Sequence, residues 1–252
     1  MKLWASYFFI LFLICVLPCD AEGVISFDFA GSGRGQNISS LTWSHTVSPS
    51  ATSTILIVGV SIGSGGNQTV SSMTYAGQSL QKIYNGLNGA GCQYEMWYMI
   101  APQTGANNVI VTISGNADMV VGSVSLSGVD QVSPFEQQGV NRYVTNSGNN
   151  NSPTVSISTV NNNAWIIDLL TFQQNSNAAM TAYVGRQQQW NLVQNSIGGA
   201  GSTYGPVATG GTNVNMSWSL SANKKWGIIA VSLKPVSSGA IPITIINWKE
   251  AY

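Results

Sequence analysis

The chain has 252 residues, of which 44% are hydrophobic and only 7% are charged. This balance excludes an intrinsically disordered chain, because disordered segments combine low hydrophobicity with high net charge. Nine basic and nine acidic residues give a formal net charge of zero, so the sequence lacks the basic surface that binding to nucleic acid requires.

Residues 1–21 are predicted to be a signal peptide. Lys2 supplies a positive charge, residues 3–17 form an almost unbroken apolar run, and Cys19 and Ala21 are small residues at the −3 and −1 positions of a cleavage site. An apolar run of this length is typical of a secretory signal and too short to span a membrane. We therefore expect a secreted or cell-surface protein without membrane insertion after signal removal. A retained anchor and acylation of Cys19 are the alternatives.

Residues 22–236 are expected to form one all-β domain, a β-sandwich of jelly-roll type, because short apolar segments alternate with Gly, Asn and Ser turns. Apolar and polar residues alternate over 213–220 and 109–113, which predicts strands with one buried face. The segments 55–58, 165–167 and 228–231 are apolar on both faces and suit central strands. Turns or loops are expected at 63–66, 85–91, 146–151, 198–201 and 210–211.

An internal repeat is predicted from an ungapped alignment of residues 111–129 with residues 218–236, in which Val124 matches Val231 and Ser125 matches Ser232. Further back, residues 55–62 have the character of residues 164–171. The repeat predicts pseudo-symmetric halves, residues 38–129 and 152–236, around one core. Two tandem domains linked by residues 146–153 are the alternative. Residues 237–252 are interpreted as a linker and a truncated strand-like tail.

The mature chain contains several characteristic blocks in order, among them TWSHTV (42–47), MTYAGQSLQKI (73–83), EMWYMIAPQTGANNVIVTIS (95–114) and KKWGIIAVSLKP (224–235). In these blocks, residues 38–236 resemble a poorly characterised β-sandwich module of large exported bacterial proteins. The tail, residues 241–252, is similar to the opening strand of the fibronectin-like region near the C-termini of exported Bacteroidota proteins. The resemblance implies an interaction or adhesion unit and brings no established catalytic residue.

Catalysis by paired carboxylates is not favoured, because glycoside hydrolysis needs two carboxylates that face each other and no such pair stands out. Asp168 lies in the apolar segment 165–170. We expect its side chain on the solvent face or satisfied by a neighbouring strand, with a pKa-shifted role as the alternative. Glu95 alternates with Trp97, as a sugar-binding pair or an exposed rim. We expect no catalytic residues, and a polysaccharide-degrading enzyme is the alternative.

His45 and Cys92 are the only histidine and the only mature cysteine. No intramolecular disulfide or structural zinc site can be built from them. We expect His45 to be a hydrogen-bonded, partly buried residue packed by Trp43, since no nucleophile elbow accompanies it. No calcium loop is present, so no cofactor or metal is expected, although calcium held by backbone carbonyls stays open.

The predicted ligand site lies in the loop-rich region around residues 183–204. Exposed Trp and Tyr rings stack on the apolar faces of sugars, and amide side chains bind hydroxyl groups. The candidate ligand-binding residues are Trp190, Tyr183, Tyr204 and Gln188, while Trp43, Trp165 and Trp218 are expected in the core. The sequence therefore predicts a non-catalytic interaction module that binds an extracellular glycan, matrix or surface polymer. A purely structural spacer of a surface protein is the alternative.

Overall fold

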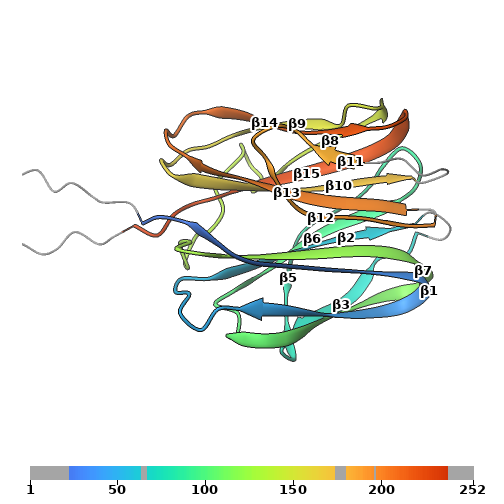
Figure 1. Cartoon of the computed structure of the whole chain (residues 1–252), viewed down its shortest axis with the longest axis horizontal. Helices are drawn as coiled ribbons and strands as arrows, with labels where there is room; N and C mark the ends of the chain where they lie inside the picture. The colour runs from blue at the N-terminus through green and yellow to red at the C-terminus, as the bar shows by residue number, and fades with distance from the viewer. Residues whose placement is uncertain (1–22, 64–66, 174–179, 196, 238–252) are drawn as a thin grey trace, which may run out of the picture.

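The computed structural model describes residues 23–63, 67–173, 180–195 and 197–237. The predicted signal peptide and residues 238–252 of the predicted tail lie outside this range. All sheets of the described residues are antiparallel and none of these residues is helical, which confirms the predicted all-β class (Figure 1). The described part accordingly contains no helix long and apolar enough to cross a membrane.

The N-terminal half is a seven-stranded sheet that folds over on itself. The strand β7 allows this, because its first part pairs with β3 and its second part with β2, while β1 follows it along both parts. The inner layer has the order β1–β7–β2–β6–β5. The strands are β1 (Ser26–Val47), β2 (Ile55–Ile62), β3 (Val70–Tyr75), β4 (Gln78–Ser79), β5 (Gln81–Leu87), β6 (Gln93–Ile100) and β7 (Gly105–Ser127).

The C-terminal half consists of two separate sheets. Its inner sheet has the order β8–β15–β10–β13–β12, and its outer sheet has the order β9–β14–β11. The strands are β8 (Val144–Asn150), β9 (Thr154–Ser158), β10 (Ala164–Gln173), β11 (Met180–Ala182), β12 (Gln187–Gln194), β13 (Ile197–Val207), β14 (Asn213–Leu220) and β15 (Lys224–Leu233).

The two halves share one order of strand pairing, since each inner strand of one half has a counterpart at the same place in the other. Both edge strands β5 and β12 also carry a bulge at the matching position, at Ile83 and at Gln189. In each half, four neighbouring strands contribute one residue each to a row of paired positions. The row is Gln81, Tyr98, Ile57 and Val124 in the N-terminal half. The matching row is Gln187, Thr203, Ile167 and Val231 in the C-terminal half. Ile57 therefore corresponds to Ile167, one residue along from the alignment predicted from sequence.

Among the described residues three large apolar cores lie between four layers of strands, and Cys92, Val120 and Ile197 form a fourth, smaller cluster (Figure 1). We call the core between the two inner layers the seam core, because it joins the halves. Side chains alternate across β2 and β10, so that Ile57 and Ile167 enter the seam core while Val58 and Leu170 enter the cores of their own halves. The segments predicted to be apolar on both faces are thus central strands covered on both sides.

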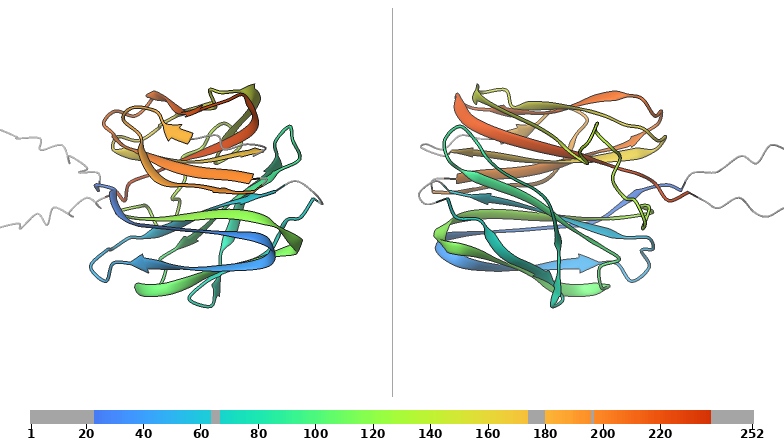
Figure 2. Two further views of the ribbon diagram at one scale, coloured as in Figure 1. Left: turned by 45° about the vertical axis from the view of Figure 1, so that its right-hand side comes forward. Right: turned by 180° about the vertical axis from the view of Figure 1, so that it is seen from behind.

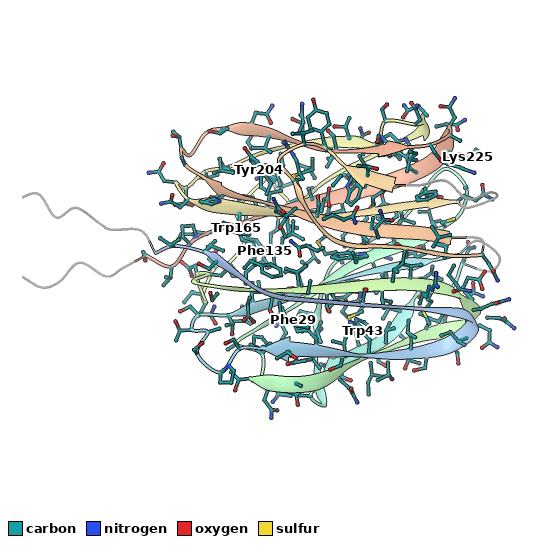
Figure 3. The ribbon with its side chains drawn as sticks, viewed as in Figure 1. Phe29, Trp43, Phe135, Trp165, Tyr204 and Lys225 are labelled. Carbon is teal, nitrogen blue, oxygen red and sulfur yellow. The ribbon has the colours of Figure 1, made fainter. Side chains whose placement is uncertain are left out.

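Large side chains from both halves fill the seam core. Phe135 and Trp165 lie between the halves, whereas Trp43 lies within the N-terminal half (Figure 3). Burying one large apolar side chain stabilises the fold by about 1.5–3 kcal/mol. The seam core is formed by Ile25, Ile55, Ile57, Tyr94, Met96, Tyr98, Val124, Leu126, Val129, Phe135, Ile167, Leu169, Trp190, Ile229, Val231 and Leu233.

Two of the predicted turns are wrong. Residues 146–150 belong to the strand β8, and Gly198–Gly201 lie inside β13. The segment that crosses between the halves is instead residues 128–143, which we call the connector. At one end of the molecule the connector meets both ends of the domain, because the Gly23 amide donates to the Val236 carbonyl (2.7 Å) and the Val236 amide donates to the Gly128 carbonyl (2.9 Å).

Candidate functional site

Trp190, the first predicted ligand residue, is a core residue. Its side chain is only 4% exposed, and its ring lies so close to Gly122 and Gly201 that a Cβ at either glycine would approach it to 2.0–2.1 Å. Gly201 is its register partner in β13, whereas Gly122 belongs to β7 across the seam. A ring that stacks on a sugar must be exposed, so the prediction for Trp190 is corrected: this residue joins the halves.

Tyr183 and Tyr204 do come together, around a residue that the sequence did not single out. The guanidinium carbon of Arg186 lies 4.4 Å from the ring centroid of Tyr204 and 5.8 Å from that of Tyr183. Arg186 also donates to the backbone carbonyls of Val184 and Asn215, which holds it in place. Tyr183 is 61% exposed and Tyr204 is half-buried. We call Tyr183, Arg186 and Tyr204 the tyrosine platform.

Gln188, the fourth predicted residue, is exposed on β12 beside its register partner Ser202. Its side-chain oxygen accepts a hydrogen bond from the Asn191 amide group at 3.0 Å. Paired residues point to the same face of a sheet, and side chains alternate along a strand, so Gln188 shares a face with Tyr204. Three of the four predicted residues therefore belong to one surface region.

Asp168 is fully buried and satisfied by neighbouring strands, as one of the two structural readings expected. Its Oδ1 accepts from the amide (2.7 Å) and the hydroxyl (3.0 Å) of Ser202, and its Oδ2 accepts from Trp218 Nε1 (2.8 Å). Desolvation by burial raises the pKa of Asp168 to about 7, against the lowering effect of these hydrogen bonds and of Arg186. With three donors from the fold on its two oxygens, this carboxylate acts as a structural acceptor.

Glu95 and Trp97 form neither an exposed sugar-binding pair nor a rim, so both expectations for them are corrected. Glu95 is fully buried and Trp97 is 9% exposed. Glu95 accepts from Trp97 Nε1 (3.0 Å) and from the Val70 amide (2.8 Å), and it forms an ion pair with Lys82 Nζ (3.0 Å). The carboxylate thereby ties β3, β5 and β6 together.

His45 is buried within a network of serine hydroxyls. Its ring nitrogens lie 2.9 Å from Ser123 Oγ and 3.0 Å from Ser125 Oγ, and Trp43 Nε1 donates to the same Ser123 (2.9 Å). Ser125 in turn donates to Asp28 (2.7 Å). Burial lowers the pKa of His45 to about 4, opposed by the charge of Asp28. The expectation of a hydrogen-bonded histidine is confirmed, but the ring is fully buried and not partly buried, with 0% exposure. Its ring neighbours are Phe29 (5.2 Å) and Tyr75 (6.1 Å), whereas Trp43 meets it only through the shared Ser123.

A groove opens at the other edge of the seam. Two adjoining depressions of about 250 and 280 Å³ lie between β5 and β6 on one side and the connector on the other, and both are lined by Tyr98 and Arg142. Seen from behind, the connector passes beside β5 and β6 on its way to the C-terminal half (Figure 2). We call this feature the seam groove, and it is lined by Gln81, Lys82, Ile83, Tyr98, Ile100, Val132, Ser133, Pro134, Phe135, Val140, Asn141, Arg142 and Tyr143.

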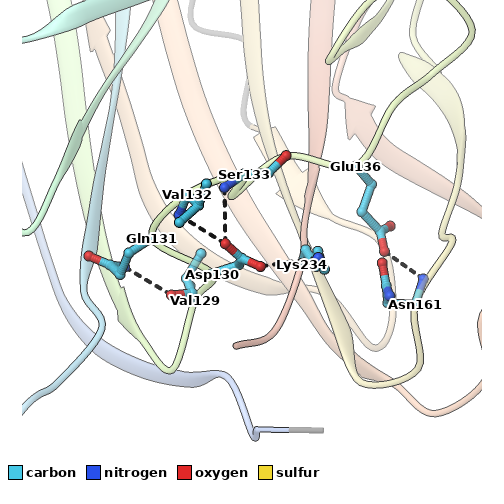
Figure 4. A network of polar contacts seen from close by, with 8 residues as sticks. All are labelled: Val129, Asp130, Gln131, Val132, Ser133, Glu136, Asn161 and Lys234. Atoms are coloured by element: carbon cyan, nitrogen blue, oxygen red, sulfur yellow. Dashed lines mark hydrogen bonds and ion pairs between the residues drawn. The ribbon is translucent and has the colours of Figure 1, made fainter. Parts of the chain in front are cut away.

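One wall of the seam groove, the first part of the connector, is held by polar contacts (Figure 4). Asp130 accepts from the amides of Val132 and Ser133, both at 2.9 Å, and forms an ion pair with Lys234 at 3.1 Å. Partial burial acts to raise the pKa of Asp130, but these amides and Lys234 outweigh it and the net shift is downward. A wall fixed before a ligand arrives lowers the entropy cost of binding.

The second part of the connector is fixed as well and places Arg142 over the groove. Buried Glu136 accepts from the Val160 amide (2.9 Å), the Asn161 amide (2.6 Å) and the Ser232 hydroxyl (2.6 Å). Gln138 and Asn141 then close a tight turn by paired backbone hydrogen bonds of 2.7 and 3.2 Å. Within this turn Gly139 has a φ of 64°, a conformation that glycine adopts without strain.

Aromatic rings form the floor and one end of the groove. The Tyr98 ring meets the Phe135 ring edge-on at 4.9 Å, and its hydroxyl donates to the Gln81 side chain at 2.7 Å. At the other end the ring of Tyr143 lies 4.9 Å from that of Tyr84. Rings, phenolic hydroxyls and amides that converge on a concave surface are typical of small-ligand and sugar sites.

This site has little local signal in the sequence, because its walls come from residues 81–100 and 132–143, which meet only when the halves pack. By register, however, the predicted residues Gln188 and Trp190 are the counterparts of Lys82 and Tyr84 at the groove. Among the described residues no cluster of three or more His, Cys, Asp or Glu side chains could hold a metal ion. Comparisons with protein-family models and with curated proteins found no match for the chain.

Proposed function

We propose that this chain is a secreted, non-catalytic β-sandwich module that binds an extracellular glycan or surface polymer in the seam groove. The observation that carries the proposal is the groove itself: two adjoining depressions that share Tyr98 and Arg142 and lie between fixed walls. A polymer can lie along such a groove with an apolar sugar face on the half-buried Tyr143 ring and its hydroxyls on Gln81, Ser133 and Asn141.

Binding without catalysis is favoured by the placement of the acidic side chains. None of the residues that line the seam groove is a carboxylate, whereas glycoside hydrolysis uses two of them across the bound sugar. The buried carboxylates of Glu95, Glu136 and Asp168 instead accept hydrogen bonds from the fold. We further propose that the matched halves arose by internal duplication, supported by their common strand order and matching bulges.

A glycan array probed with the purified chain tests the proposal. We expect retention on a subset of extended glycans, lost when Tyr143→Ala removes the ring at one end of the groove. The matched control is Tyr183→Ala, which removes an exposed ring from the tyrosine platform and should leave retention unchanged. The reverse result, loss in Tyr183→Ala alone, would move the site to the tyrosine platform. Absence of retention on every glycan would instead support a structural spacer.

A further inference from the structure

The seam groove differs in charge from the chain as a whole, in which basic and acidic residues are equal in number. Its lining contains two basic side chains, Lys82 and Arg142, and no carboxylate. Lys82 is already engaged, because it forms an ion pair with buried Glu95 and lies 4.8 Å from the ring centroid of Trp97. Arg142 is exposed, and no described carboxylate forms an ion pair with it.

The acidic side chains closest to Arg142 along the connector have other partners. Asp130 is engaged by Lys234 and two backbone amides, and Glu136 by two amides and the Ser232 hydroxyl. Neither can turn toward Arg142 without giving up these bonds. The guanidinium therefore offers an uncompensated positive charge at the place where the two depressions meet.

The chemistry of arginine indicates which group this charge would bind. A guanidinium presents a planar fork of N–H donors that matches two oxygens of one carboxylate or sulfate, and such charge-assisted pairs are stronger than neutral hydrogen bonds. The half-buried ring of Tyr143 suits the uncharged carbon face of a sugar. Together the guanidinium and this ring suit a sugar ring that carries an acidic group.

We infer that the ligand of the seam groove is an anionic polysaccharide and that Arg142 pairs with its carboxylate or sulfate groups. This inference rests on the proposed function, since it names the class of polymer that the same groove takes. The two depressions on either side of Arg142 allow neighbouring sugars of one chain to lie in both, with an acidic group between them.

Calorimetry of the full chain with three polymers tests the inference: polygalacturonate as the carboxylate polymer, dextran sulfate as the sulfate polymer, and unmodified dextran as the neutral one. We expect at least one anionic polymer to bind about tenfold or more tightly than dextran, and its affinity to fall as salt rises. The ratio of the two anionic affinities shows which acidic group the groove prefers.

Arg142→Gln should lower the anionic affinity about tenfold, and Arg142→Lys should restore only part of it, because the charge returns without the fork. The matched control is Arg34→Gln, an equal loss of charge at the opposite edge of the seam, where Arg34 donates to the Val193 carbonyl at 2.8 Å. This variant should change the affinity less than twofold. Thermal unfolding of each variant shows that the fold is intact.

Two results would overturn the inference. If dextran binds as tightly as the anionic polymers and Tyr143→Ala abolishes that binding, the groove is a glycan site without charge selection, and the proposed function stands alone. If Arg142→Gln and Arg34→Gln weaken anionic binding equally, the attraction is spread over the surface and Arg142 is not the anchor. Absence of binding to all three polymers counts against both the inference and the proposed function.

Discussion

The two edges of the seam core are formed by strands with the same order of pairing, β12 on one side and β5 on the other, but one edge is packed closed and the other opens as the seam groove. At the closed edge Trp190 lies over Gly122 and against its register partner Gly201, and it is 4% exposed. At the open edge the matching residue is Tyr84, whose register partner is Met96 and whose ring is half-buried. The methionine side chain occupies the space that Gly201 leaves for the ring at the closed edge. The same strand order therefore produces two different edges. Where glycines lie beneath the large ring the edge is packed closed, and where a methionine takes the place of the paired glycine the edge stays open as a groove.

The largest change in stability is expected when the closed edge loses its central ring. Trp190→Ala should lower the free energy of unfolding by about 3–5 kcal/mol, because it leaves a ring-sized cavity in the seam core. Tyr84→Ala, at the half-buried counterpart, should cost about 1 kcal/mol. Urea denaturation followed by circular dichroism measures both.

Trp190→Phe provides the control for ring packing. Trp190 Nε1 has no hydrogen-bond partner among the described residues, so the phenyl ring gives up volume without giving up a hydrogen bond. The cost should stay below about 1.5 kcal/mol. Equal costs for Trp190→Ala and Tyr84→Ala would show that the two edges are not energetically different.

A second prediction sharpens the comparison of the halves through their buried titratable groups. Burial raises the pKa of Asp168 in the C-terminal half from 3.8 to about 7, so its contribution to stability is complete below pH 3.8 and declines as the pH rises toward 7. Burial lowers the pKa of His45 in the N-terminal half from 6.5 to about 4, so its contribution is present above pH 6.5 and declines as the pH falls toward 4.

Between about pH 4 and 6.5 the two trends oppose each other, and the stability of the unmodified chain should be nearly independent of pH. His45→Gln should leave the Asp168 trend, with stability falling by up to about 1.4 kcal/mol for each unit of rising pH. Asp168→Asn should leave the opposite trend. Urea denaturation at pH 4.5, 5.5 and 6.5 checks the three slopes, and slopes of the same sign in both variants would contradict the cancellation.

A third prediction tests the closed edge by adding volume to it. Gly122→Ala places a Cβ 2.0 Å from the Trp190 ring, which should cost about 1–3 kcal/mol by overpacking. The control on the same strand is Gly115→Ala, where the nearest atom is the flexible Gln68 side chain at 3.4 Å. This variant should keep the stability of the unmodified chain. A shift in the thermal midpoint for Gly115→Ala as large as for Gly122→Ala would argue against a tight closed edge.

Much of the strand layout could be predicted from alternation and from apolar runs. The alternation at Val214, Met216 and Trp218 identifies the buried face of β14, and the apolar segments at 55–58 and 165–167 identify central strands. The prediction of a turn at 198–201 is wrong because it rests on the general rule that glycine interrupts strands. In β13 they make room for neighbours instead, since a Cβ at Gly198 would lie 2.3 Å from the Phe172 ring.

The site was harder to predict, since its residues meet only through the packing of the halves. Tyr98 reads as a strand residue like its neighbours, and Arg142 follows a polar stretch with no local motif. They come together only when the two halves pack, and the pattern of apolar residues within one strand does not indicate which strands of the other half it will face. The aromatic and amide residues near Trp190, from which a ligand site is predicted, lie on β12 at the closed edge. This edge corresponds by register to the edge at β5 where the groove opens.

The backbone clasp between Gly23 and Val236 has a mechanical consequence. The first and last strands of the described part begin and end side by side. Polypeptide segments fused before Gly23 and after Val236 would therefore meet at the clasp, and the rest of the described part would project from that point. Tension applied through both neighbouring segments would act first on the clasp, and the seam groove would lie outside the loaded path.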